Sequence, residues 1–289
     1  MKVVKSMLLF LVLYIFVVTG ILYAEEVKPP DTKPQEKPAE EKVTGSGSLG
    51  VYNQYIFRGY EIGKSGLVVQ PSLAASFKGF SATIWGNMDA NQRNTKTAAF
   101  GQEFKKGWNE TDLTLSYTHA FNKLSLTGGF IYYGTKYCDE TEELFASATY
   151  DILTKPTLAV YRDITNYKGT YFNLSFSHSV PVYKDTTLDL GASFGYFIGE
   201  SNYWKTYDQA TASYTGSKYK GFHDGMLKAG LTIPITKALS IQPLVQYWFP
   251  LSNDAKKEYA TAGDIKDSYN PNGPVKSNFI YGVGITYSF

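Results

Sequence analysis

The sequence has very few of the residues that build disulfides, metal centres and catalytic dyads. Its 289 residues include one cysteine, Cys138, and three histidines, His119, His178 and His223. A single cysteine excludes an internal disulfide and a structural zinc site made of clustered thiols. The scattered loop carboxylates do not have the spacing of an EF-hand. We therefore expect no metal ion and no organic cofactor.

An excess of charge of either sign is also missing. The chain has 28 Lys and Arg against 26 Asp and Glu, a formal net charge of +2. Two of the basic residues, Lys2 and Lys5, belong to the N-terminal segment, and without them the two signs balance. Because nucleic-acid-binding domains normally carry a basic patch or stripe, we expect no nucleic-acid partner.

Long apolar runs are limited to the N-terminus. The run over residues 7–18 follows a short basic region and precedes a small residue, Ala24. This order predicts a cleaved secretory signal peptide over residues 1–24. The alternative, a membrane-anchoring helix, needs about 20 apolar residues and is disfavoured by the short run. Residues 25–45 are rich in Pro, Glu and Lys and predict a flexible periplasmic segment, because such a composition cannot form a core.

Beyond the N-terminus, no run approaches 18 apolar residues, so no membrane helix is expected there. The chain is nevertheless rich in aromatic residues, with 24 Tyr and 18 Phe. An exported chain of this composition is either a soluble β-sandwich or an outer-membrane β-barrel. Residue patterning distinguishes the two.

Apolar and small residues alternate along many segments, most clearly at the C-terminus. One face of the last predicted strand carries Phe279, Tyr281, Val283, Ile285, Tyr287 and Phe289, and the other carries Ile280, Gly282, Gly284, Thr286 and Ser288. Side chains alternate across a strand, so one face is apolar and the other mostly small and polar. The second face is too small and polar for the interior of a β-sandwich. In a membrane β-barrel, the apolar face would contact lipid and the small polar face would line the lumen.

Counting such segments over residues 46–289 predicts an all-β fold, a transmembrane antiparallel β-barrel of about twelve strands. The expected strands are 46–59, 66–77, 79–89, 109–120, 124–134, 143–152, 157–165, 169–181, 187–199, 222–234, 239–250 and 275–289. An even number is expected of single-chain bacterial barrels, as are short periplasmic turns and longer extracellular loops. The expected long loops are 90–108, 135–142, 200–221 and 251–274, whereas 60–65 and 166–168 are expected to be short.

Some features do not fit this scheme. Asn53 would face lipid, and alternation over 157–165 is weak. Pro71 and Pro243 fall inside predicted strands and suggest bulges or shifted boundaries, because proline cannot donate to a ladder. The loop 200–221 could contain a further extended segment.

Extending the alternation places several charged residues inside the barrel. These pore-lining candidates are Arg58, Asp89, Glu110, Asp112, Glu143 and Lys228. The first five would lie in the outer half, and four acids against one arginine predict a mild cation preference, because rings of charged side chains select ions. The alternative is that the charges pair and stiffen the barrel. Arg58 beside Asp89 is the expected pair.

Large side chains should make the lumen narrow. Twelve strands fall between the filled interior of eight and the wide channel of sixteen or more. The aromatic residues expected to point inward are Tyr52, Trp85, Tyr133, Phe145 and Phe197. We therefore expect a narrow pore, open to small solutes or closed by loops.

Short phrases in the first strands resemble a known family. They are Tyr55-Ile56-Phe57-Arg58-Gly59, Val69-Gln70-Pro71-Ser72-Leu73, Trp85-Gly86-Asn87-Met88-Asp89, Glu110-Thr111-Asp112-Leu113, and the Gly-Phe-Ile-Tyr-Tyr stretch at 129–133. Over about residues 46–289 the chain resembles the TorF-family porins, a group of bacterial outer-membrane proteins. The resemblance implies a barrel and a channel, but no particular solute.

The expected function is passive passage of small hydrophilic solutes or ions through the bacterial outer membrane, in contact with its lipid. The terminal Phe289 resembles the C-terminal signal read by the outer-membrane assembly machinery. Two alternatives remain open. One is a non-conducting adhesin or structural barrel that works through its outer loops. The other is a lipid hydrolase, which is disfavoured because no motif links His223 to a serine.

Overall fold

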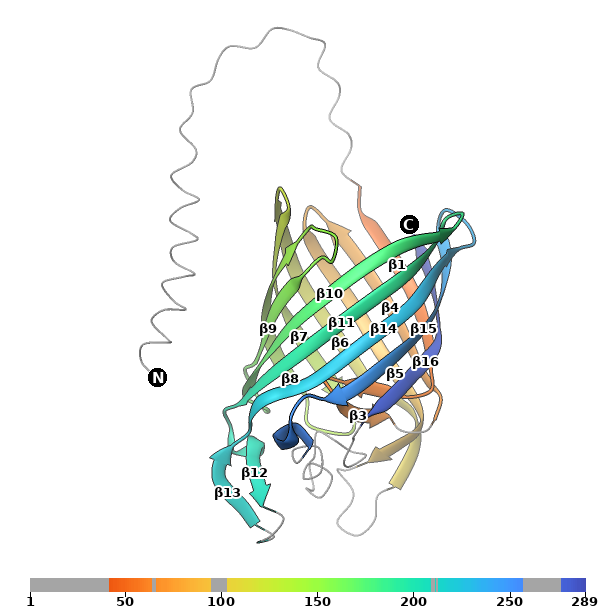
Figure 1. The fold of residues 1–289 in the computed structure, drawn as a ribbon. Coiled ribbons are helices and arrows are strands. Elements are labelled where there is room, and N and C mark those ends of the chain that lie inside the picture. The colour runs from red at the N-terminus through yellow and green to blue at the C-terminus, as the bar shows by residue number, and fades with distance from the viewer. Residues whose placement is uncertain (1–41, 64–65, 95–102, 209–210, 212, 257–276) are drawn as a thin grey trace, which may run out of the picture. The chain divides into compact units, whose positions relative to one another are not determined.

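The computed structural model describes residues 42–63, 66–94, 103–208, 211, 213–256 and 277–289. Within these residues, twelve strands form one closed antiparallel barrel, in which β1 pairs with both β4 and β16 (Figure 1). The barrel strands are β1 (Thr44–Tyr52), β4 (Val68–Phe77), β5 (Phe80–Asn94), β6 (Glu103–Phe121), β7 (Leu124–Thr135), β8 (Thr141–Tyr150), β9 (Thr157–Asp163), β10 (Gly169–Tyr183), β11 (Thr186–Gly199), β14 (Lys220–Pro234), β15 (Leu239–Pro250) and β16 (Asn278–Ser288).

Besides a short helical segment at residues 253–256, the described elements outside the barrel wall are two small hairpins and a 3₁₀ turn. They are β2 (Tyr55–Phe57) with β3 (Tyr60–Gly63), β12 (Lys205–Asp208) with β13 (Ser213–Lys218), and the turn η1 (Asn202–Trp204). The described part of the chain contains no helix long and apolar enough to span a membrane.

The expected all-β barrel and its twelve strands are confirmed. The weakly alternating segment 157–165 is the strand β9, and the loop 200–221 contains the extended segments β12 and β13. Several predicted boundaries are wrong. β5 extends to Asn94 and β6 begins at Glu103, so both strands enter the expected loop 90–108. The first strand ends at Tyr52 rather than at residue 59, and residues 60–65 are not merely a short connection, because β3 lies there.

Asn53 marks the point where the chain leaves the barrel wall. Its side-chain Nδ2 donates to the carbonyl of Phe279 at 3.0 Å, and its Oδ1 accepts from the backbone N–H of Tyr281 at 2.8 Å. The side-chain amide thus hydrogen-bonds to β16 much as another strand residue would. Because β16 keeps its partners, the backbone after Asn53 can turn away from the wall.

The turns between β4 and β5, β6 and β7, β8 and β9, β10 and β11, and β14 and β15 lie at one end of the barrel, here called the turn end. In the turn between β4 and β5, Lys78 and Gly79 both have positive φ, 50° and 84°. That geometry matches the twist of a tight hairpin. Both chain termini of the barrel lie at this end, where Gly45 N–H donates to the carbonyl of Phe289 at 2.8 Å. The opposite end is called the loop end.

The two faces of the wall differ as the alternation predicts. In β16, Phe279 and Tyr281 are 65% and 61% exposed, whereas Ile280 between them is 6% exposed. The exposed apolar side chains recur around the barrel, including Leu73, Phe80, Ile84, Leu115, Leu144, Leu158, Leu190, Leu227 and Val245. An apolar outer face of this kind is suited to contact with lipid hydrocarbon.

The two strand prolines interrupt pairing without shifting it. Pro71 pairs with Leu49 of β1, and Pro243 pairs with Val283 of β16. On their other sides the ladders skip these residues and resume in the same register. The expected bulge or boundary shift is therefore wrong, and each proline instead leaves a gap in one ladder.

Several predictions fall on residues outside the described ones. They are the signal peptide over 1–24, most of the segment 25–45, part of the loop 90–108 and most of the loop 251–274. These remain predictions.

Candidate functional site

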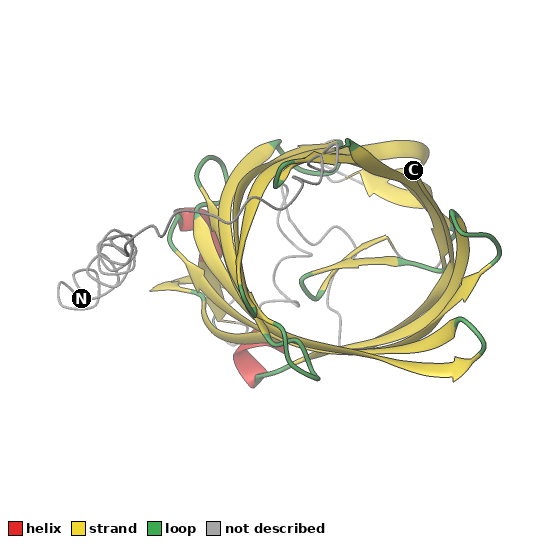
Figure 2. Ribbon diagram, turned by 90° about the horizontal axis from the view of Figure 1, so that it is seen from above, coloured by secondary structure: helices red, strands yellow, loops and turns green. Residues whose placement is uncertain are grey.

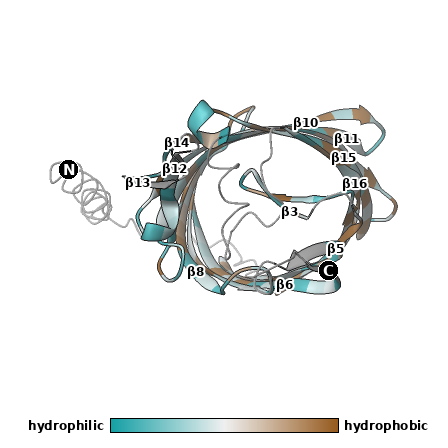
Figure 3. Cartoon of the chain, turned by 90° about the horizontal axis from the view of Figure 1, so that it is seen from below, coloured by the Kyte–Doolittle hydropathy of each residue, from teal (hydrophilic) through white to brown (hydrophobic). Residues whose placement is uncertain are grey.

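A hairpin formed by β2 and β3, residues Tyr55–Gly63, lies inside the ring of barrel strands (Figures 2 and 3). We call it the inward hairpin. Its turn residues Arg58 and Gly59 have φ angles of 47° and 78°. Two successive positive angles define the tight turn that an X-Gly pair favours between alternating apolar residues. The sequence therefore specifies this hairpin locally, with Arg58 at its tip.

The Arg58 side chain makes the strongest contacts between the hairpin and the wall. Its Nη1 and Nη2 donate to the two carboxylate oxygens of Glu143 at 2.6 and 2.7 Å. Its guanidinium also lies over the rings of Tyr161 and Tyr171, each 4.6 Å from the ring centroid, and over Phe57 at 4.7 Å. Bidentate carboxylate pairing and stacking on aromatic faces are the two interactions that arginine makes best.

Contacts within the barrel wall also hold these partners. Tyr133 donates to Glu143 Oε2 at 2.9 Å, and Tyr171 donates to the carboxylate of Asp224 at 3.0 Å. Tyr161 stacks on Phe145 with 5.7 Å between ring centroids. We call this group the Arg58 pocket. Its wall residues are Tyr133, Glu143, Tyr161, Tyr171 and Asp224, from β7, β8, β9, β10 and β14.

A β-bulge brings Asp224 to the pocket. Gly225 pairs with Phe194 and Phe222 pairs with Tyr196, so His223 and Asp224 together oppose the single residue between. Such an extra residue re-aims neighbouring side chains. Both are fully buried, although neighbours in a regular strand would point to opposite faces. His223 hydrogen-bonds to the backbone of Arg58 and to the hydroxyl of Tyr219, at 2.9 Å for the latter.

The rest of the inward hairpin packs into an aromatic core at the loop end. Tyr60 and Ile62 are 2% and 0% exposed. They belong to one buried cluster, the loop-end core, with Tyr137, Cys138, Tyr167, Tyr171, Phe197, Trp204, Tyr219 and Ala255. Trp204 Nε1 donates to the carbonyl of Tyr167 at 2.8 Å. The Tyr167 hydroxyl is withdrawn from water in this core, and its burial raises its pKa above the usual range. The hairpin is thus held by apolar contacts as well as by Arg58.

Three of the predicted acids gather on β5 and β6 near the base of the hairpin. Glu110 lies opposite Asn87, and Asp112 lies opposite Trp85 in the strand register. Tyr55 of the hairpin donates to Glu110 Oε1 at 3.4 Å. One oxygen each of Asp89, Glu110 and Asp112 is buried and accepts no hydrogen bond from the described residues.

Lys228 lies apart from these acids, in a polar cavity in the turn-end half of the lumen. The cavity has a volume of about 320 Å³ and is lined by Asp189, Lys228, Gln242 and Thr232, among others. Asp189 accepts hydrogen bonds from Ser179 and Thr232, each at 2.6 Å. Water and small polar solutes can therefore occupy this part of the interior.

The structure corrects the predicted role of Arg58. It does not lie near the outer end of the first strand and does not pair with Asp89, because the hairpin carries it across to Glu143. Sequence reasoning missed the aromatic partners and Asp224. Tyr161 was hidden by weak alternation, and Asp224 by the bulge. The Arg-Gly turn between Tyr-Ile-Phe and Tyr-Glu-Ile was a usable hairpin signal.

The three histidines lie in different surroundings. His119 packs against Phe121, with 4.3 Å between ring centroids. His178 Nδ1 contacts the carbonyl of Leu153 at 2.9 Å. His223 contacts tyrosine side chains and the backbone of Arg58.

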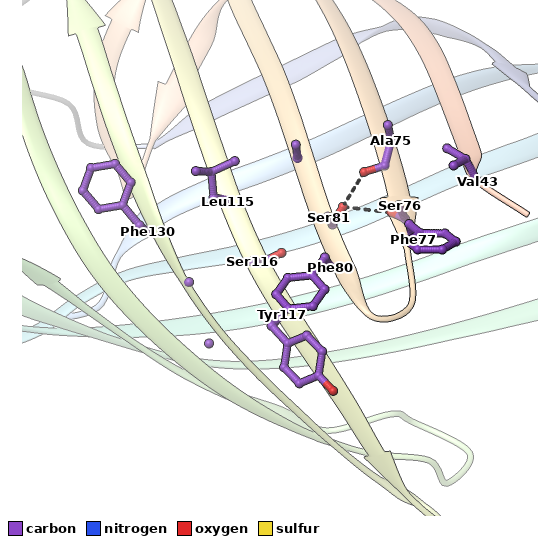
Figure 4. Close-up of a pocket in the computed structure, with 13 residues that line it drawn as sticks. Val43, Ala75, Ser76, Phe77, Phe80, Ser81, Leu115, Ser116, Tyr117 and Phe130 are labelled. Carbon is purple, nitrogen blue, oxygen red and sulfur yellow. Dashed lines mark hydrogen bonds between the residues drawn. The ribbon is translucent and has the colours of Figure 1, made fainter. Parts of the chain in front are cut away.

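An apolar depression lies on the outer face of the wall, separate from the lumen (Figure 4). It spans β4 to β7 near the turn end, where the small residues Ala75, Ala82 and Gly128 lie among Phe77, Phe80, Leu115, Tyr117 and Phe130. Its surface is almost entirely apolar, as expected of a surface covered by lipid.

Comparison with solved structures returns other outer-membrane barrels. The KdgM porin aligns over 84% of this chain and 99% of its own, with 15% identity and a TM-score of 0.49. The NanC porin aligns over 85% and 99%, with 9% identity and a TM-score of 0.47. The outer membrane phospholipase A of Escherichia coli aligns over 88% and 94%, with 13% identity and a TM-score of 0.41.

No family model matches the chain, and no curated protein matches it. Membership of the TorF family is therefore a hypothesis that rests on the sequence phrases. At these identities and TM-scores, the solved structures do not decide between a channel, an enzyme and a binding protein.

Proposed function

We propose that the chain forms a narrow passive channel for small hydrophilic solutes or ions in the bacterial outer membrane, as a porin of the TorF type. The observation that carries the proposal is a closed barrel with an apolar outer face and a polar cavity in its lumen. Outer-membrane lipid would cover the apolar face. Phe289 would direct assembly by the outer-membrane machinery, after export by the signal peptide of residues 1–24.

The inward hairpin sets the width of this channel. It occupies the loop-end half of the lumen, whereas the polar cavity near Lys228 lies toward the turn end. Twelve strands alone would leave a channel of intermediate width. A chain segment folded across that space restricts passage to small solutes.

The charges that face the lumen favour cations. In the loop-end half, the carboxyl groups of Asp89, Glu110, Asp112 and Glu143 are accompanied by one arginine, Arg58, whose charge is already matched by Glu143. Rings of side-chain carboxylates are a recognised basis of cation selectivity.

Single-channel recording of the purified chain in a planar bilayer tests both the conduction and the cation preference. Stepwise currents that scale with salt are expected, and the reversal potential under a KCl gradient should report a cation preference. Asp89→Asn and Glu110→Gln should shift it toward anions. Glu142→Gln is the matched control, because Glu142 lies next to Glu143 in β8 but on the opposite face.

Two outcomes would contradict the proposal. Unchanged reversal potentials in both variants would remove these acids as the source of selectivity. A folded, inserted barrel that passes no current would favour the alternative of a surface adhesin or structural barrel. Deletions in the outer loops would then become the next variants to examine.

A further inference from the structure

The contacts of Arg58 have the composition of a ligand site rather than of an ordinary ion pair. A carboxylate binds both terminal nitrogens, and aromatic rings cover the guanidinium at 4.6 Å on Tyr161 and on Tyr171. Aromatic faces combined with carboxylates are the usual means by which proteins recognise organic cations. Here the cation belongs to the same chain.

The wall side of the pocket is held by hydrogen bonds between residues of the barrel strands. Tyr133 orients Glu143 and Tyr171 orients Asp224 through hydrogen bonds within the barrel wall. Asn173 of β10 in turn donates to the Tyr171 hydroxyl at 3.2 Å. Only Arg58 and Phe57 come from the hairpin. Removal of the Arg58 side chain should therefore leave the other partners in place.

The fit is close. Little space remains around Arg58, about 20 Å³ between it and the neighbouring groups. The Arg58 and Glu143 side chains are 13% and 7% exposed, so the pair is largely withdrawn from water. Glu143 binds the guanidinium directly, and Asp224 accepts a hydrogen bond from Tyr171, whose ring the guanidinium covers. A vacated pocket would therefore contain uncompensated acid.

From this geometry we propose that the Arg58 pocket is a binding site for guanidinium-type cations, and that the inward hairpin is its tethered occupant. A free guanidinium compound competes with Arg58 for the same wall residues. In the wild-type chain the tether gives Arg58 a high local concentration, so Arg58 occupies the pocket in preference to a free guanidinium compound. In a chain without this side chain, the site is open to the free cation.

This inference does not depend on the proposed channel function, because it can be tested by stability alone. Full-length Arg58→Ala is refolded into detergent, and the folded fraction and thermal unfolding midpoint are followed with added ethylguanidinium at millimolar concentration. Ethylurea is the control, because it has nearly the same shape without the charge. We expect ethylguanidinium, but not ethylurea, to raise the folded fraction or the midpoint of the variant.

Two further variants make the result specific. Wild type should respond weakly, because its pocket is filled. Arg58→Ala combined with Glu143→Gln should lose most of the response, because the bidentate acceptor is gone. If Arg58→Ala does not fold by itself, the refolding yield with and without ethylguanidinium is the readout.

An absent response, or one that is equal with ethylurea or in wild type, would overturn the proposal. Its failure would leave the channel proposal intact, because conductance is measured separately on the wild-type chain. Conversely, a non-conducting barrel could still show the ethylguanidinium response.

Discussion

Arg58 and Glu143 are 85 positions apart in the chain, yet they form a bidentate ion pair inside the barrel at 2.6 and 2.7 Å. One partner belongs to the inward hairpin and the other to the wall strand β8. Because both side chains are largely buried, the contact is protected from the screening that weakens exposed pairs. It fixes the tip of the hairpin across the lumen.

Loss of this pair should loosen the hairpin and widen the channel. For Arg58→Ala we expect a higher single-channel conductance and a lower unfolding midpoint, because breaking a buried pair costs about 3–5 kcal/mol. Arg162→Ala is the control, since Arg162 pairs with Glu200 and is 39% exposed. Thermal unfolding in detergent and bilayer currents check the two effects. An unchanged conductance in a folded Arg58→Ala barrel would contradict the expectation that the ion pair keeps the lumen narrow.

The turn that presents Arg58 should be sensitive to any side chain at Gly59. Its φ of 78° is strained for other residues, so Gly59→Val should destabilise the hairpin by about 1–3 kcal/mol. Gly47→Ala in β1 is the control, because a Cβ at Gly47 would meet no atom within 4 Å. Differential scanning measurements of both variants provide the comparison. Equal midpoints would show that the turn contributes nothing to stability.

The residues of the barrel wall were predictable because a lipid-facing surface requires strict alternation. β15 spans residues 239–250 as expected, and β16 differs by only a few residues. The inward hairpin was missed because the aromatic alternation of Tyr55 and Phe57 continues that of β1, so the two read as one strand. The side-chain hydrogen bonds of Asn53 and Gln54 to distant β16 mark where the wall ends, and the alternation pattern does not contain them.

The candidate site was harder to predict, since it joins residues from five strands with a separate hairpin. The alternation along its strand identified Glu143 as a lumen residue, but it could not identify Arg58 as the partner of Glu143. Alternation also mispredicts the face of a residue at a β-bulge. His223 and Asp224 are neighbours there, yet together they oppose one residue of β11. Pairing across a barrel is set by how far a loop folds inward, and local patterns contain no measure of that distance.

Orientation of the wall can be tested with a paired substitution on β5. Ile84 is 54% exposed on the outer face, and its neighbour Thr83 points to the lumen side. Ile84→Arg should destabilise the inserted barrel by about 2–4 kcal/mol, because it places a charge in hydrocarbon. Thr83→Arg should have a smaller effect on stability and should change the conductance. Urea titrations in lipid vesicles measure the difference in stability between the two variants. Equal destabilisation by both variants would contradict a lipid-covered outer face.

Cys138 offers a native reporter of the contact between the hairpin and the loop-end core. The side chain is 2% exposed and shares its cluster with Tyr60 and Ile62 of the hairpin. Its Sγ lies 3.1 Å from the hydroxyl of Thr135. In the folded wild-type chain we therefore expect slow reaction with a water-soluble maleimide, at a rate set by local opening.

Release of the hairpin should expose this thiol. Labelling of Arg58→Ala should be at least several-fold faster than labelling of wild type under conditions where both remain folded barrels, because the core then loses the support of Tyr60 and Ile62. Arg162→Ala should label at the wild-type rate, and fully unfolded chains should label fast in every case. Mass spectrometry over a time course gives the rates. If Arg58→Ala labelled as slowly as wild type, the apolar contacts of the hairpin would be sufficient to hold it, and the ion pair would serve only to place its tip.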